Sequence, residues 1–126
     1  MGLLKKINAL EPLWWSLFGL GGMIAAFILP VHIFLHGIAI PMGWASPDLL
    51  SYERMMSVLS SPYGIIVKLF LFSIISFPLF HAAHRIRLTI EDLRIGWLNT
   101  VMPLISYGGA IVLSVITLAV LFYKLS

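Results

Sequence analysis

The chain has 126 residues, of which 60% are hydrophobic and only 10% are charged. Soluble globular domains carry about 45–50% apolar and about 25% charged residues, so this composition excludes an ordinary water-soluble domain. The net charge of +3 is small, and the lack of cysteine excludes disulfides, thiolate-ligated zinc, Cys-ligated iron–sulfur clusters and cysteine nucleophiles.

Three apolar stretches are each long enough to cross a bilayer, and we predict helices around them at about 13–42, 62–88 and 97–124. Crossing a hydrocarbon core of about 30 Å takes about 20 apolar residues, and backbone groups in lipid must hydrogen-bond within their own segment. We therefore predict an all-α membrane protein, with three transmembrane helices in a single membrane-anchor domain over residues 1–126. The first stretch is too long for a signal-peptide core and ends without a small-residue cleavage site, so we expect it to be retained.

Two local patterns add detail to these spans. The first span carries glycines whose small size lets another helix approach closely; they are Gly19, Gly21 and Gly22. In the connection that follows, Ser46 before Pro47 is typical of a helix start, because serine caps the helix and proline suits its first turn. We predict a short helix at the membrane surface over about 47–59.

The orientation of the spans is predicted by the distribution of Lys and Arg, which are enriched in cytoplasmic loops. The basic residues on one side are Lys5, Lys6, Arg85, Arg87 and Arg94, and those on the other side are Arg54, Lys68 and Lys124. This distribution predicts a cytoplasmic N-terminus and a cytoplasmic loop between the second and third spans. Three spans then leave the C-terminus on the periplasmic or extracellular side.

Polar side chains gather at the predicted cytoplasmic end of span two. His81, His84 and Arg85 stand at positions i, i+3 and i+4, so they share one helix face. Ionisable residues at membrane depth are costly and mark functional sites. The group is either a cationic helix end whose side chains reach the membrane surface, or a site for a cofactor or a lipophilic substrate with a polar head.

The start of span one lies at the same depth and has the sequence Glu11-Pro-Leu-Trp14-Trp15. Tryptophan at a membrane interface is ordinarily an anchor. An indole N–H is also a hydrogen-bond donor that suits a quinone carbonyl. We expect that this cluster and the end of span two can meet.

A second histidine pair, His32 and His36, lies further along span one toward the other leaflet. It is either a polar pair that faces a partner helix or a pair with a haem or proton role. The sequence contains no Gly-rich phosphate loop, paired-carboxylate site or metal-binding Cys/His array. We therefore predict no catalytic and no metal-binding residues.

A set of motifs falls in order between about residues 9 and 95. The motifs are Glu11–Met23 (EPLWWSLFGLGGM), Pro30, Leu50–Arg54 (LSYER), Phe77–Arg85 (FPLFHAAHR) and Asp92-Leu93. As a set, with this spacing, they resemble the D subunit of bacterial fumarate reductase. Span three matches that family in hydrophobicity only.

The resemblance implies a hydrophobic anchor that crosses the bacterial cytoplasmic (inner) membrane several times. With a second three-helix anchor, the C subunit of fumarate reductase, it would hold an iron–sulfur subunit and a flavoprotein subunit on the cytoplasmic side. Electrons would pass from menaquinol through the iron–sulfur subunit to flavin, where fumarate becomes succinate. The anchor itself would be non-catalytic, and we expect these subunits and lipid, but no nucleic acid, as its partners.

The resemblance also implies which residues bind the quinone. The tryptophan of the Glu-Pro motif and the His-Arg pair that ends span two line the family's quinone pocket, and here they are Trp15, His84 and Arg85. Trp15 would donate to a quinone carbonyl, Arg85 would stabilise the reduced anion, and His84 would orient the pocket or relay protons. Phe18, one turn after Trp15, is expected in the pocket wall.

A haem is an open alternative beside menaquinone. His81 lies eleven residues before Asp92, which is the separation of an axial haem histidine from an Asp in haem-bearing succinate dehydrogenases. Some members of the resembled family carry Cys or His here and have no haem. The second axial ligand of a haem b would have to come from the C subunit.

Two other functions are open at this point. One is the small anchor of a succinate dehydrogenase, whose physiological direction is the reverse. The other is a structural or transport-related membrane protein without a redox role.

Overall fold

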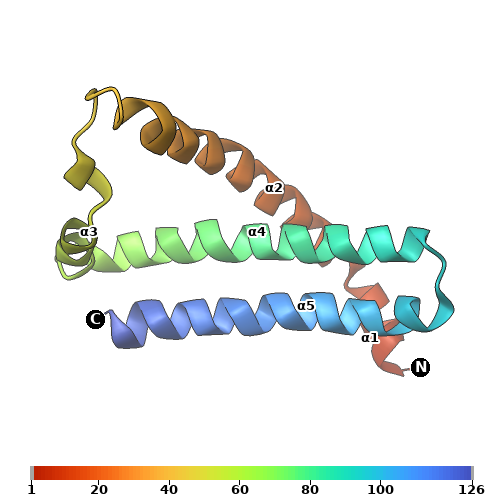
Figure 1. Ribbon diagram of the computed structural model, residues 1–126. Helices are drawn as coiled ribbons and strands as arrows, with labels where there is room; N and C mark the ends of the chain where they lie inside the picture. The colour runs from red at the N-terminus through yellow and green to blue at the C-terminus, as the bar shows by residue number, and fades with distance from the viewer. Residues whose placement is uncertain (1, 126) are drawn as a thin grey trace.

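The computed structural model describes residues 2–125 and contains three long apolar helices (Figure 1). Helix α2 (Glu11–Phe34) continues into the π-helical turn η1 (Leu35–Ala39), and α5 (Gly96–Ala119) continues into the π-helical turn η3 (Val120–Lys124). Between them lies α4 (Gly64–Asp92). Each continuous helix has 29 residues, which corresponds to about 44 Å at about 1.5 Å per residue. The predicted all-α fold with three helices long enough to span a membrane is confirmed.

The helix ends lie within a few residues of the predicted ones. The first helix begins at Glu11, before the predicted position 13, because Pro12 is compatible with a first turn. It ends at Ala39 rather than near 42, and the chain then turns at Gly43, whose φ is +74°. The second helix continues to Asp92, beyond the predicted 88, and its last turn contains the polar residues Thr89, Glu91 and Asp92.

The connection between the first two spans contains two short helical pieces. Where one helix over 47–59 was predicted, the structure has a 3-10 turn, η2 (Pro47–Leu50), and a separate helix, α3 (Tyr52–Leu59). The break occurs at Ser51, whose backbone is extended and whose side chain accepts from the backbone N–H of Arg54. Ser51 thus caps a new helix instead of continuing the first.

A third short helix, α1 (Gly2–Ala9), was not predicted. It lies beside the start of α5 in Figure 1. Ile7 of α1 partly covers the buried cluster formed by Trp14, Ala83, Tyr107 and Ala110, and the indole N–H of Trp14 donates to the Ile7 carbonyl at 3.2 Å. The N-terminal helix is therefore tied to the end of the bundle that carries the start of α2.

Helix α4 is the middle of the bundle, because both α2 and α5 pack against it. Figure 1 shows α4 and α5 running side by side, while α2 crosses α4 near its own N-terminal half and diverges toward the α3 end. Glycine permits the crossing. A Cβ on Gly21 would overlap the carbonyl oxygen of Phe77, and one on Gly22 would lie 2.8 Å from the His81 ring. The predicted close approach therefore involves Gly21 and Gly22, whereas Gly19 has open space around it.

Few residues of the three spans are buried by contacts within the chain. In the most apolar window of each span, between 6% and 22% of the residues are buried. The spans therefore present apolar side chains outward over most of their length, which lipid or partner helices must cover. The internal core lies near the α1 end, where Trp14 stacks on Tyr107 with ring centroids 4.2 Å apart.

Candidate functional site

A cluster of aromatic and imidazole rings occupies the crossing of α2 and α4. Trp15 and Phe18 come from the start of α2, and His81 and His84 come from the second half of α4. The ring centroids of Trp15 and His84 are 5.4 Å apart, those of Phe18 and His84 are 5.0 Å apart, and those of Phe18 and His81 are 4.3 Å apart. The structure thus brings four of the five predicted site residues into one contiguous cluster.

His84 is the most deeply placed member of this ring cluster. Its exposed fraction is 0%. The Nδ1 atom is hydrogen-bonded to the hydroxyl of Tyr107, which comes from α5, at 2.6 Å. The Nε2 atom is buried and has no hydrogen-bond partner among residues 2–125. A buried polar nitrogen is ordinarily paired, so this atom is available to a partner from outside residues 2–125.

His81 packs flat against α2. Its ring stacks on Phe18 with an angle of 5° between the planes, and its Nδ1 atom is hydrogen-bonded to the Phe18 carbonyl at 2.8 Å. Because a carbonyl accepts only, the hydrogen of the neutral ring lies on Nδ1 and Nε2 keeps its lone pair. That is the arrangement of a metal-bound imidazole.

A haem would need a second axial ligand opposite His81. His84 lies on the same helix and the same side of α4, so it cannot reach the other face of a porphyrin bound by His81. Across the described part of the chain, no group of three or more His, Asp or Glu residues could hold a metal ion. Within residues 2–125, His84 therefore does not complete a haem site with His81.

Arg85 and Trp15 lie at the same end of the bundle, because Trp15 contacts His84, the residue before Arg85. Arg85 is exposed, and its guanidinium forms no hydrogen bond or ion pair with the described residues. The Trp15 ring is 54% exposed. Both side chains are thus accessible to a ligand or a partner helix at this end.

The two adjacent tryptophans have different surroundings. Trp14 is buried, stacks on Tyr107 and uses its indole N–H in the bond to α1 described above. Trp15 lies about 100° further around the helix and is free of those contacts. Trp14 therefore serves the internal core, and Trp15 is the tryptophan that borders the ring cluster.

An ionic network joins three helices directly behind His84, and sequence reasoning did not identify it as part of the site. Arg87 is buried, and its Nη1 and Nε atoms each donate at 2.8 Å, to Glu11 of α2 and to Glu91 of α4. The same Nη1 donates to the Tyr107 hydroxyl at 3.2 Å. The i, i+4 spacing of Arg87 and Glu91 was a visible signal, but the pairing with Glu11 and Tyr107 depends on how the helices pack.

Replacing Arg87 with leucine is expected to lower the free energy of unfolding by about 2–4 kcal/mol. The substitution leaves Glu11 and Glu91 without their partner. The expected destabilisation is smaller than for a fully buried ion pair, because both carboxylates are about one-third exposed. Thermal unfolding of the purified protein measures this change. The matched control is Arg85→Leu, two residues away, which should leave stability nearly unchanged because Arg85 is exposed. Equal losses of stability in both variants would contradict a stabilising role for the Arg87 ion pairs.

His32 and His36 lie in the other half of the first span, far along α2 from the ring cluster. Both are exposed, their ring centroids are 6.2 Å apart, and His32 Nδ1 is hydrogen-bonded to the Ile28 carbonyl at 3.0 Å. They belong to the part of the first span that diverges from α4 (Figure 1). They therefore do not contribute to the ring cluster.

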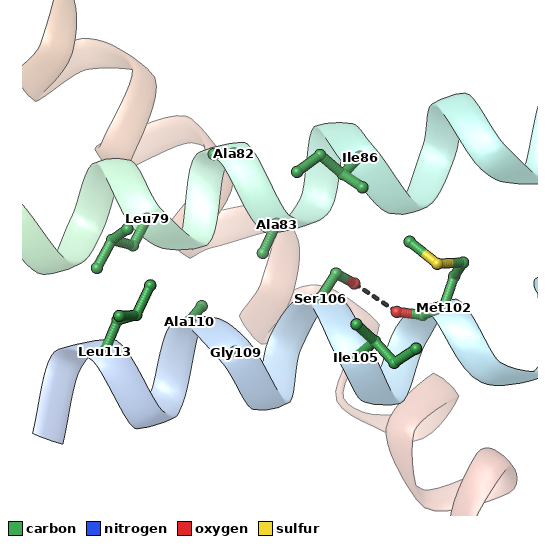
Figure 2. A pocket seen from close by; sticks show the side chains of 10 residues that line it. All are labelled: Leu79, Ala82, Ala83, Ile86, Met102, Ile105, Ser106, Gly109, Ala110 and Leu113. Carbon is green, nitrogen blue, oxygen red and sulfur yellow. Dashed lines mark hydrogen bonds between the residues drawn. The ribbon is translucent and has the colours of Figure 1, made fainter.

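A separate groove of about 270 Å³ lies between α4 and α5 (Figure 2). All of its lining residues except Ser106 are apolar or glycine, and the Ser106 hydroxyl donates to the Met102 carbonyl of its own helix at 2.7 Å. Its α4 residues, such as Ala82 and Ile86, lie on the side of that helix opposite His81 and His84. The groove suits an apolar chain and does not offer the hydrogen-bond donors of the ring cluster.

The chemistry of the ring cluster follows from its donors. The rings of Trp15 and Phe18 contact His84, whose Nε2 atom has no partner within residues 2–125, and Arg85 is the next residue of α4. Such a set suits a flat aromatic molecule that carries oxygen acceptors at its edge.

Comparison with known proteins gives a consistent result. A family model for the D subunit of fumarate reductase matches residues 5–122. The chain is 36% identical over 112 residues to the fumarate reductase D subunit of Vibrio cholerae, covering 89% of this chain and 83% of that protein. It is 43% identical over 84 residues to the Vibrio vulnificus protein of the same description, covering 67% of this chain and 65% of that protein. The Mycobacterium bovis protein of this description is 36% identical over 109 residues, covering 85% and 82% of the two chains.

Proposed function

This chain belongs to the family of fumarate reductase D subunits, and from that premise we propose that it anchors a fumarate reductase to the membrane and helps to bind menaquinol. Its partners in this proposal are the C subunit within the membrane, and the iron–sulfur and flavoprotein subunits on the cytoplasmic side. The chain itself performs no chemical step. The outward apolar surface of the three spans supports the proposal, because a second anchor would cover part of it.

The single observation that carries the quinol proposal is the contact of Trp15 and Phe18 with His84, whose Nε2 atom is buried without a partner in the described chain. A menaquinol head is a flat ring system with an oxygen on each of two opposite edges. In the proposal, Trp15 donates its N–H to one of these oxygens, and Phe18 packs against the ring. Arg85 stabilises the negative charge that develops as the quinol loses a proton.

Oxidation of menaquinol releases two electrons and two protons and leaves menaquinone. In the proposal, the electrons pass to the iron–sulfur subunit, so the quinol head must lie near the membrane face where that subunit docks. The ring cluster lies in the first third of the first span and in the second half of α4, on the side of the crossing where α2 begins and α4 ends. Haem b is no part of this route; His81 would be one axial ligand if the complex held a haem, with the other from the C subunit.

We place that end of the bundle in the cytoplasm and the protein in the bacterial inner membrane. The basic residues Lys5 and Lys6 belong to α1, which lies beside the start of α5 (Figure 1), and Arg94 lies in the loop that precedes α5. These charges therefore gather on one side, as expected for the cytoplasmic face. The C-terminus is then periplasmic.

Cysteine labelling tests this orientation with little background, because the natural chain has no cysteine. Leu93→Cys lies in the loop after α4, and Trp44→Cys lies in the connection on the opposite side; both positions are exposed. In intact cells, a membrane-impermeant maleimide should label Trp44→Cys and spare Leu93→Cys, and opening the membrane with detergent should permit labelling of both. Labelling of Leu93→Cys alone in intact cells would reverse the proposed topology.

Purification through an affinity tag on this chain tests the anchor function. The expected preparation contains a second anchor, an iron–sulfur subunit and a flavoprotein, and it reduces fumarate with menaquinol as donor. A visible spectrum of the same sample reports haem b directly. Recovery of the chain as a stable homo-oligomer without flavin would contradict the proposal.

A further inference from the structure

The hydrogen bonds behind His84 have a fixed direction. An arginine guanidinium only donates, so Arg87 Nη1 donates to the Tyr107 hydroxyl oxygen at 3.2 Å. The Tyr107 hydroxyl has one proton of its own. His84 Nδ1, at 2.6 Å from that oxygen, is the remaining partner in the described chain.

The opposite direction is disfavoured by burial. If His84 Nδ1 carried the hydrogen and donated to Tyr107, the Tyr107 oxygen would accept twice and its own proton would have no acceptor. Tyr107 is only 3% exposed, so water is excluded from that position. A buried hydroxyl proton without an acceptor is costly, and the network avoids this cost when Tyr107 donates to His84.

The orientation of Arg87 is itself held from two other sides. Glu11 of α2 and Glu91 of α4 each accept from the guanidinium at 2.8 Å. The donor aimed at Tyr107 is thus fixed by two carboxylates on two helices. The order of donation runs from Arg87 to Tyr107 and from Tyr107 to His84.

We propose that Arg87 and Tyr107 are positioning residues that hold neutral His84 with its hydrogen on Nε2, so that His84 presents an N–H donor to an oxygen of the quinone head. This inference rests on the proposed function of the ring cluster. It assigns an acceptor to the one buried nitrogen of His84 that has no partner within residues 2–125. Because His84 has no exposed surface, the quinone reaches this nitrogen only when a neighbouring ring, such as that of the half-exposed Trp15, moves aside. The sequence left open whether His84 orients the pocket or relays protons. An Nε2 atom that already carries a hydrogen can donate to the quinone and orient it, but it cannot accept a proton from the quinol.

Nitrogen-15 NMR of the whole complex with labelled histidine tests the proposal. The His84 signals are assigned by their loss in His84→Gln. The proposal predicts a protonated Nε2 and an unprotonated Nδ1 in the unaltered complex, and a mixture of both neutral forms in Tyr107→Phe. Tyr123→Phe, at an exposed tyrosine outside the ring cluster, is the matched control and should keep the unaltered pattern. A hydrogen on Nδ1 of His84 in the unaltered complex would overturn the proposal without any variant.

Kinetics give a second readout. Tyr107→Phe should raise the KM for menaquinol about twofold, because only the fraction of His84 that still carries its hydrogen on Nε2 can donate to the quinone. The rate of dye-linked fumarate reduction should stay unchanged. Arg87→Lys keeps a charged donor and should retain more menaquinol affinity than Arg87→Leu. An unchanged KM in Tyr107→Phe together with an unchanged tautomer would refute the positioning role. Failure of the positioning role can be distinguished from failure of the proposed quinol binding. If the ring cluster does not bind quinol, Trp15→Leu will keep normal menaquinol activity, whatever the tautomer of His84.

Discussion

Replacing Trp15 with leucine in the assembled complex is expected to lower menaquinol-linked fumarate reduction about tenfold or more, while fumarate reduction from a soluble dye survives. The leucine removes the indole N–H and one wall of the ring cluster, where Trp15 lies 5.4 Å from His84 and 5.6 Å from Phe18 between ring centroids. One lost hydrogen bond to the substrate already accounts for about a factor of ten. The measurement is the ratio of the two rates in the same preparation.

Two further variants make this result specific. Trp97→Leu removes a tryptophan that is 69% exposed at the start of α5, at the same end of the bundle, and should leave the ratio unchanged. Arg85→Leu should lower the ratio as Trp15→Leu does, while leaving thermal stability intact. Equal ratios in the Trp15, Arg85 and Trp97 variants would show that the ring cluster does not bind quinol.

Replacing Gly21 with leucine is expected to separate α2 from α4 and to prevent assembly of the complex. A Cβ at this position would overlap the Phe77 carbonyl oxygen and lie 2.9 Å from the Cβ of His81. The first obstacle is backbone, so the helices themselves must move apart. We expect a destabilisation above about 3 kcal/mol, the upper end of ordinary overpacking. The level of assembled complex in membranes and its thermal unfolding measure the effect.

Gly19→Leu is the matched control, because Gly19 lies on the same helix and a Cβ there has nothing within 4 Å. It should assemble normally. Normal assembly and normal menaquinol activity in Gly21→Leu would contradict the close crossing of the two helices.

The three long helices could be predicted because hydropathy and length decide them without reference to neighbours. The short helix α1 was missed for the opposite reason. Eight residues hold little helical preference in isolation, and α1 is stabilised by Ile7 against Trp14 and by the hydrogen bond between them. Contacts with the rest of the chain, which the local sequence does not reveal, determine this element.

The ring cluster was partly predictable. The spacing of His81, His84 and Arg85 placed them on one face, and the depth of Trp15 placed it at the same end. The residue pattern alone did not distinguish Trp14 from Trp15, and only the family resemblance selected Trp15, because the side of α2 that faces inward depends on where α1 and α5 pack. Arg87 was counted in the sequence only as a cytoplasmic charge, yet it is buried and holds the Tyr107 hydroxyl.

Tyr107 illustrates the same limit more sharply. It lies in an apolar third span, and its contact with His84 depends on the register of α5 against α4. Sequence separation hides such a contact, since the two residues are 23 positions apart in the chain. Packing geometry alone brings the phenol to the imidazole.

A cryo-electron microscopy map of the complete complex with bound menaquinone tests the central claim most directly. We predict that the quinone head lies within hydrogen-bond distance of the Trp15 indole nitrogen and His84 Nε2, with Phe18 against its ring and the iron–sulfur subunit over the same end of α2 and α4. A quinone head near His32 and His36, with lipid or a partner helix filling the space beside Trp15, would contradict the account.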